Sequence, residues 1–166
     1  MNILLAGSGA NENSSKLLLD LIIPKYYIDK IYLSEQLDLA KERVISRMRH
    51  KTYDYVFLFE MNTATPATDQ VTFEVAAKLN EIEYKTNYEY DNLYEFLKQR
   101  QFHVKVSEKS VQGIANDLYY EALQMIYKNA QSTKCILISV PEVAQINVMK
   151  LAYNIINYFN TPLKVL

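Results

Sequence analysis

The residue best suited to covalent chemistry in this chain is Cys135, its only cysteine. A thiol peptidase needs a thiolate within hydrogen-bond reach of an imidazole that a third group orients. Cys135 opens a predicted strand whose far end is Ser139, so the thiol should lie roughly 13 Å from the edge where such strands hold their ligands. His50 and His103 precede or begin strands, which places both on the opposite edge. The sequence therefore offers no Cys–His pair, and Cys135 is expected to be a small buried hydrophobic residue.

Hydroxyl groups are the next candidates for a nucleophile. Ser8, Ser14 and Ser139 could serve in principle, but no histidine is placed to activate them. Ser14, like Asn13 and Ser15, is better explained as the cap of a helix that begins there.

Motifs for metals and nucleotides are missing as well. Two distant histidines and one cysteine cannot supply a zinc site. The run Gly7-Ser8-Gly9 lacks the third glycine of a dinucleotide fingerprint and the Gly-Lys-Ser/Thr of a P-loop. We therefore expect no metal and no cofactor.

The elements that must position these residues alternate between strands and helices. Apolar runs and period-2 alternation predict strands over 2–6, 28–33, 53–59, 71–80, 102–106 and 135–139. Caps and helical periodicity predict helices over 13–23, 34–48, 90–100, 110–130 and 142–159. Residues 61–68, small and polar around Pro66, are predicted to form a loop.

This alternation predicts an α/β fold, a three-layer sandwich with a mainly parallel central sheet, in a single domain over residues 1–166. Ligands of such sheets bind outside the carboxyl ends of the strands. The loops expected at that edge are 7–13, 60–69, 107–112 and 139–142. The candidate ligand-binding residues are Gly7, Ser8, Gly9, Asn13, Glu60, Asn62 and Gly113.

Segments along most of the chain resemble the pyroglutamyl peptidase I family of cysteine peptidases. The run SVQGIANDLYYEAL (110–123) is similar to the helix that a glycine precedes and whose catalytic cysteine follows four residues later. The run CILISVPEVAQ (135–145) resembles the strand that ends in a His-Val-Pro turn, and FEVAAKLN (73–80) resembles the strand with the catalytic glutamate. Similar matches in the same order are ILLAGSGANENSSKLLLDLI (3–22), residues 26–59 and residues 88–113.

The resemblance implies a peptidase fold without the chemistry that defines the family. Gly113 is the glycine before the helix, Asp117 takes the nucleophile position, Ser139 takes the base position, and Glu74 matches the catalytic glutamate. The same geometry would bring Glu74 and Asp117 together, either as an acid–base pair with one raised pKa or as two solvated carboxylates. The resemblance also implies that the segment between Asn80 and Tyr90 is shorter than the loop and hairpin that help to close the family's active site.

Three functions are compatible with these residues. The first is a catalytically degenerate protein, a pseudoenzyme, that binds a small molecule or a peptide N-terminus or acts in protein assembly. The second is a hydrolase of changed chemistry built on Glu74, Asp117 and Ser139. The third is residual peptidase activity that removes an N-terminal pyroglutamate.

Composition narrows the class of partner. The chain has 166 residues, 49% of them hydrophobic, and a formal net charge of −1, so we expect a folded core and neither nucleic acid nor a membrane as partner. It shows no signal peptide and no run near the ~20 apolar residues of a membrane span, which predicts a cytoplasmic protein. Its 14 tyrosines suit the surface of a homo-oligomer, or equally a general use of tyrosine at half-buried positions.

Overall fold

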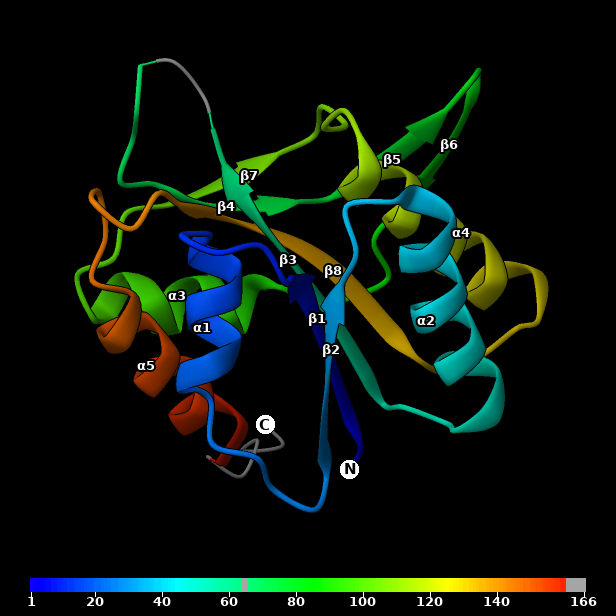
Figure 1. Ribbon diagram of the computed structural model, residues 1–166, viewed down its shortest axis with the longest axis horizontal. Coiled ribbons are helices and arrows are strands. Elements are labelled where there is room, and N and C mark those ends of the chain that lie inside the picture. The colour runs from blue at the N-terminus through cyan, green and yellow to red at the C-terminus, as the bar shows by residue number, and fades with distance from the viewer. Residues whose placement is uncertain (64–65, 161–166) are drawn as a thin grey trace.

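The computed structural model describes residues 1–63 and 66–160 (Figure 1). The helices are α1 (Ser14–Leu21), α2 (Leu37–His50), α3 (Asp91–Gln99), α4 (Ile114–Lys128) and α5 (Val148–Asn160). The strands are β1 (Ile3–Ser8), β2 (Ile28–Leu33), β3 (Tyr55–Asn62), β4 (Val71–Glu74), β5 (Ala76–Leu79), β6 (Ile82–Lys85), β7 (Val104–Ser107) and β8 (Lys134–Pro141). No helix among the described residues is long and apolar enough to cross a membrane.

A six-stranded sheet of order β2-β1-β3-β8-β4-β7 forms the centre of the molecule. Strands β2, β1, β3 and β8 are parallel, whereas β4 pairs antiparallel with β8 and parallel with β7. Every residue of β8 from Cys135 to Pro141 is buried, as expected for a central strand with both faces covered. The prediction of a mainly parallel sheet is confirmed.

Helices cover both faces of this sheet. Helices α1, α3 and α5 pack on one face, and α2 and α4 pack on the other (Figure 1). Alternate strand residues point to opposite faces, so Phe57 joins the core under α1 and α5, whereas Val56 and Leu58 join the core under α2 and α4. The predicted three-layer α/β sandwich is therefore confirmed.

The predicted strand 71–80 is wrong in one respect, because it is two strands in two different sheets. β4 belongs to the central sheet, whereas β5 forms a separate antiparallel hairpin with β6. The chain leaves the central sheet at Val75, whose N–H donates to Ser107 O at 3.0 Å and whose carbonyl accepts from Thr86 N at 2.9 Å. Asn80, with φ of 54°, makes the turn of the hairpin. Uninterrupted alternation of apolar residues conceals a change of pairing partner.

Several predicted boundaries also shift. β3 continues through Met61 and Asn62, which were expected in a loop, and Ala64 and Thr65 of that loop lie outside the described residues. β8 likewise continues to Pro141, which pairs with Asn62, so Ser139 lies inside the strand and not at its end.

The last helix begins at residue 148 and not at 142. Asn147 Oδ1 accepts a hydrogen bond from Lys150 N at 2.9 Å and so caps α5, while Gln145 N donates to Glu142 O in a turn before it. The proline at 141 ends the strand here instead of starting the helix.

Candidate functional site

Three polar side chains from adjacent strands meet near the carboxyl end of β8. Ser139 Oγ lies 2.6 Å from Glu60 Oε1 and 2.8 Å from Glu74 Oε1. Parallel pairing of β3 with β8 places Glu60 beside Ser139, and antiparallel pairing places Glu74 opposite Leu137, two residues earlier. Residues two apart on a strand share a face, so all three side chains lie on the side of the sheet that α2 and α4 cover.

This cluster, Glu60–Ser139–Glu74, contains one hydroxyl between two carboxyl groups. A serine hydroxyl has one proton to donate, so it satisfies one carboxylate and accepts from the other carboxyl only if that carboxyl is protonated. Burial raises the pKa of Glu60 to about 7; the Ser139 hydrogen bond lowers it in part, and the Glu74 charge raises it further. Burial also raises the pKa of Glu74, although the Ser139 hydroxyl, the Ser107 hydroxyl and the charge of Lys105 lower it in part. The geometry thus favours one shared acidic proton near neutral pH.

Glu60 is the most exposed member of the cluster. Ser139 and Glu74 are 3% and 4% exposed, whereas Glu60 is half-buried. Glu74 Oε2 is buried and has no hydrogen-bond partner among the described residues. A buried carboxylate oxygen without a partner costs free energy unless the carboxyl is protonated or a ligand or water donates to it.

Asp117, expected beside Glu74, lies in the first turn of α4 and is half-buried. Its Oδ1 accepts a hydrogen bond from Asn116 Nδ2 at 3.0 Å. The Asn116 side chain also binds both backbone groups of Lys78. Asn116 Nδ2 donates to Lys78 O at 2.8 Å, and Asn116 Oδ1 accepts from Lys78 N at 3.1 Å, which connects α4 to β5. The carboxyl that shares a hydrogen-bond partner with Glu74 is therefore that of Glu60.

Gly113 precedes α4 with φ of 92° and ψ of −162°, a backbone conformation that favours glycine. It supplies no side chain to cap the helix. Two expectations are wrong because β7 runs antiparallel to β8. Residues 107–112 leave the sheet in the direction opposite to the loops after β1, β3 and β8, and His103, which precedes β7, lies at the carboxyl edge of β8 and not at the opposite edge.

Of the predicted binding residues, Gly7 and Ser8 end β1, and Gly9 and Asn13 lie between β1 and α1. Asn13 Oδ1 caps α1 by accepting from Ser15 N at 2.9 Å and from Ser15 Oγ at 2.6 Å. Ser8 Oγ accepts from Ala10 N at 3.1 Å.

Gly7, near the end of β1, has a packing role. A Cβ at Gly7 would lie 3.2 Å from Leu19 Cδ1, so glycine lets α1 approach β1. Ser14 Oγ donates to Val140 O at 3.3 Å and holds the start of α1 against the end of β8. Asn62, the last residue of β3, is half-buried two positions after Glu60.

The thiol and the imidazoles lie apart from one another. Cys135 is fully buried, and burial alone raises the pKa of its thiol. His50 Nδ1 faces Ser46 O at 2.7 Å at the end of α2, and His103 Nδ1 lies 2.7 Å from Asp69 Oδ2; both histidines are exposed. Within residues 1–63 and 66–160, no group of three His, Cys, Asp or Glu side chains could hold a metal ion.

Solved structures similar to this chain include pyrrolidone carboxyl peptidases, also called pyroglutamyl peptidases. The fold is that of the pyroglutamyl peptidases. The enzyme of Fervidobacterium islandicum AW-1 matches at a TM-score of 0.79 with 14% identity, covering 96% of this chain and 96% of that one. The Thermus thermophilus enzyme matches at 0.75 with 14% identity, covering 92% and 96%, and Bacillus amyloliquefaciens pyroglutamyl peptidase I at 0.73 with 15% identity, covering 93% of each.

No protein-family model matches the chain, and no curated protein matches its sequence. At 12–15% identity the likeness to pyroglutamyl peptidases concerns the fold, and the chemistry of the site depends on this chain's own side chains. Glu60 was expected among the ligand-binding residues, but it was not linked to Ser139 and Glu74, with which the structure brings it together. Its position directly after the predicted strand 53–59 put it at the same edge as Ser139 and was the available signal for that link.

Proposed function

We propose that this protein is a catalytically degenerate pyroglutamyl-peptidase-like protein that binds a small molecule or a peptide N-terminus at the Glu60–Ser139–Glu74 cluster without cleaving it. The observation that carries the proposal is the position of Ser139. The resemblance to the family places a catalytic histidine there, whereas the Ser139 hydroxyl lies within 2.6 Å and 2.8 Å of two carboxyl oxygens.

Thiol chemistry has no support in the side chains present. A thiol with a raised pKa is a poor nucleophile at neutral pH, because the reacting form is the thiolate. Cys135 is completely buried four residues before Ser139 on the same strand, about 13 Å along β8. Neither histidine has Cys135 as a hydrogen-bond partner.

A ligand with N–H donors suits the cluster best. Carboxylate oxygens accept hydrogen bonds, and Glu74 Oε2 has no donor among the described residues. A ligand ammonium near Glu60 would favour its charged form and lower its raised pKa, with release of the shared proton. The free N-terminus of a peptide carries that group.

Calorimetry with two matched peptides tests the proposal. We expect Ala-Ala-Ala amide with a free N-terminus to bind at pH 7 with proton release, detected as a dependence of the heat on buffer ionisation, and we expect N-acetyl-Ala-Ala-Ala amide not to bind. Glu60→Gln should weaken binding about tenfold or more. Glu95→Gln, at an exposed carboxylate on α3, is the control. Equal binding of both peptides, or binding of neither, would contradict the proposal.

A hydrolase of changed chemistry is the second candidate, and one distance favours it. Ser139 Oγ lies 2.6 Å from the carboxylate of Glu60, whose pKa is raised to about 7, which is the range of a general base. The 3% exposure of Ser139 weighs against a nucleophile at that position. Turnover of a fluorogenic pyroglutamyl amide that survives thiol blockage and disappears in Ser139→Ala would establish this candidate in place of the first. Turnover lost on thiol blockage would instead identify residual peptidase activity.

A role in protein assembly stays a prediction that rests on exposed tyrosines. Tyr26 and Tyr153 are 96% and 65% exposed, whereas Tyr53, Tyr88 and Tyr119 are buried. The high tyrosine content therefore serves the core in part, which weakens the compositional argument for a homo-oligomer.

A further inference from the structure

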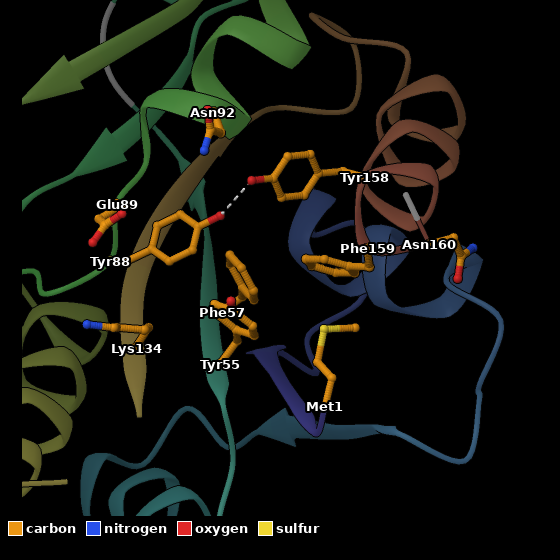
Figure 2. A pocket seen from close by; sticks show the side chains of 10 residues that line it. All are labelled: Met1, Tyr55, Phe57, Tyr88, Glu89, Asn92, Lys134, Tyr158, Phe159 and Asn160. Carbon is orange, nitrogen blue, oxygen red and sulfur yellow. Dashed lines mark hydrogen bonds between the residues drawn. The ribbon is translucent and has the colours of Figure 1, made fainter. Parts of the chain in front are cut away.

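A cavity of about 630 Å³ opens at the edge of the sheet opposite to the Glu60–Ser139–Glu74 cluster (Figure 2). Its lining includes Tyr55 and Lys134, the first residues of β3 and β8. Glu60 and Ser139 lie five residues further along these strands, on the order of 16 Å away. Tyr55 and Phe57 also point to the other face of the sheet, toward α5. This cavity, the aromatic cavity, is thus separate from the candidate site.

Aromatic rings form its walls at steep angles to one another. Tyr88 meets Tyr55 at 86° with ring centroids 6.0 Å apart, and it meets Phe57 at 75° and 5.3 Å. The ring of Phe159, in α5, is tilted by 46° to the ring of Phe57, with ring centroids 5.0 Å apart. Such edge-to-face contacts hold rings in defined orientations, so the walls are preformed. The volume falls within the range of about 300–1,000 Å³ that is typical of small-molecule sites.

Tyrosine hydroxyls supply the polar groups at this cavity. Tyr88 Oη donates to Tyr158 Oη at 3.5 Å, the outer limit of a hydrogen bond, and Figure 2 shows the two hydroxyls directed toward each other. Burial raises the pKa of the Tyr88 and Tyr158 phenols, and Tyr55 lies close enough to raise them further, so these two hydroxyls remain neutral donors at physiological pH. Two hydroxyls joined by so long a contact retain most of their capacity to bind a ligand.

Few charged groups belong to the described lining residues of the aromatic cavity. They are the side chains of Glu89 and Lys134 and the Met1 ammonium, which lies 3.8 Å from Asp54 Oδ2. In Figure 2 the Glu89 and Lys134 side chains lie outside the group of rings, and the Lys134 Nζ points away from it. A charged ligand group placed among the rings would therefore lose its hydration without gaining a counter-ion.

We propose that the aromatic cavity binds an uncharged, planar aromatic molecule that carries a hydrogen-bonding group. The ligand ring packs against Phe57, Phe159 and Tyr55, and its polar group reaches the hydroxyls of Tyr88 and Tyr158. This site is independent of the Glu60–Ser139–Glu74 cluster, so either proposal can fail without the other.

Calorimetric titration with 2-naphthol tests this inference, and 2-naphthoate serves as the probe of the same ring with a charge. We expect saturable one-to-one binding of 2-naphthol and binding of 2-naphthoate that is weaker by about tenfold or more. Tyr88→Phe and Tyr158→Phe each remove one hydroxyl and keep the ring, so each should weaken 2-naphthol binding about five- to tenfold. Tyr153→Phe, at an exposed position of the same helix, should change nothing.

Three results would overturn the proposal: no saturable binding of 2-naphthol, unchanged affinity in both phenylalanine variants, or equal affinity for the two naphthalene probes. A measurement on the unaltered protein guards against variants that misfold. With ring-labelled tyrosine, the NMR signals of Tyr55, Tyr88 and Tyr158 should shift on titration with 2-naphthol. Shifts confined to other tyrosines, or a dimer that 2-naphthol does not dissociate and Phe159→Ala does, would assign the cavity to another role.

Discussion

Glu74 Oε1 lies 2.8 Å from Ser139 Oγ across a pair of strands that run in opposite directions. The antiparallel pairing is what brings them together, because β4 is short and its last residue stops opposite the middle of β8. The parallel neighbour β3 then adds Glu60 from the other side of the same hydroxyl. One buried serine therefore couples two carboxyl groups from strands on either side of it.

The pKa of Glu60 should make stability depend on pH. Its folded pKa of about 7 lies above the ordinary 4.5, so its contribution is complete below about pH 4.5 and is lost as pH rises through about 7. At about 1.4 kcal/mol per pKa unit, the part of this stabilisation that is lost between about pH 5 and about pH 8 is on the order of 2–3 kcal/mol. In Glu60→Gln this loss should disappear, measured by urea unfolding at about pH 5 and about pH 8. Glu95→Gln, at an exposed site, should lose as much stability between the two pH values as the unaltered protein. If Glu60→Gln also lost that much, the pH dependence would not come from Glu60.

Removal of the bridging hydroxyl should destabilise the fold. In Ser139→Ala both carboxyl groups lose a buried hydrogen-bond partner, at a cost of about 1–3 kcal/mol at neutral pH. The cost should shrink at about pH 5, where Glu60 is protonated. Ser132→Ala, at an exposed serine, is the matched control for urea unfolding. An equal cost at both pH values would mean that Ser139 acts through packing alone.

Gly113→Ala should destabilise the protein through its backbone. No atom lies within 4 Å of the position that the new Cβ would take, so φ of 92° is the sole source of strain, of about 1–3 kcal/mol. Gly9→Ala is the comparison, because its Cβ would meet neighbours at an ordinary 3.4 Å. The melting temperature of Gly113→Ala should therefore be well below that of Gly9→Ala. The reverse order would contradict this explanation of the start of α4.

The thiol of Cys135 should be inert until the protein unfolds. It is completely buried, and its raised pKa disfavours the reactive thiolate. Labelling with a chromogenic disulfide reagent should proceed at the rate of unfolding in native buffer and rapidly in urea. Fast stoichiometric labelling of the native protein would show an accessible thiol and restore the case for a thiol enzyme.

Much of the architecture follows from patterns that are local in the sequence. The apolar runs of β1, β3 and β8, the asparagine cap of α1 and the glycine before α4 each appear as a few neighbouring residues with one physical reason. The distance of Cys135 from the carboxyl end of β8 also follows from its place at the start of a predicted strand, whereas the edge expected for His103 was wrong, because β7 runs antiparallel to β8. Local patterns of this kind report which residues are buried and where an element starts.

The tertiary structure decided which strands pair and in which direction. Residues 60, 74 and 139 meet only because β8 has a parallel neighbour on one side and an antiparallel one on the other, and hydrophobic alternation reports neither the direction nor the partner of a strand. The same limit concealed the break between β4 and β5 and the aromatic cavity, whose rings come from three distant segments. The sequence by itself determined a layered α/β fold with a mainly parallel sheet. Long-range strand pairing decided which carboxyl groups share a proton, because that pairing sets which side chains are desolvated together.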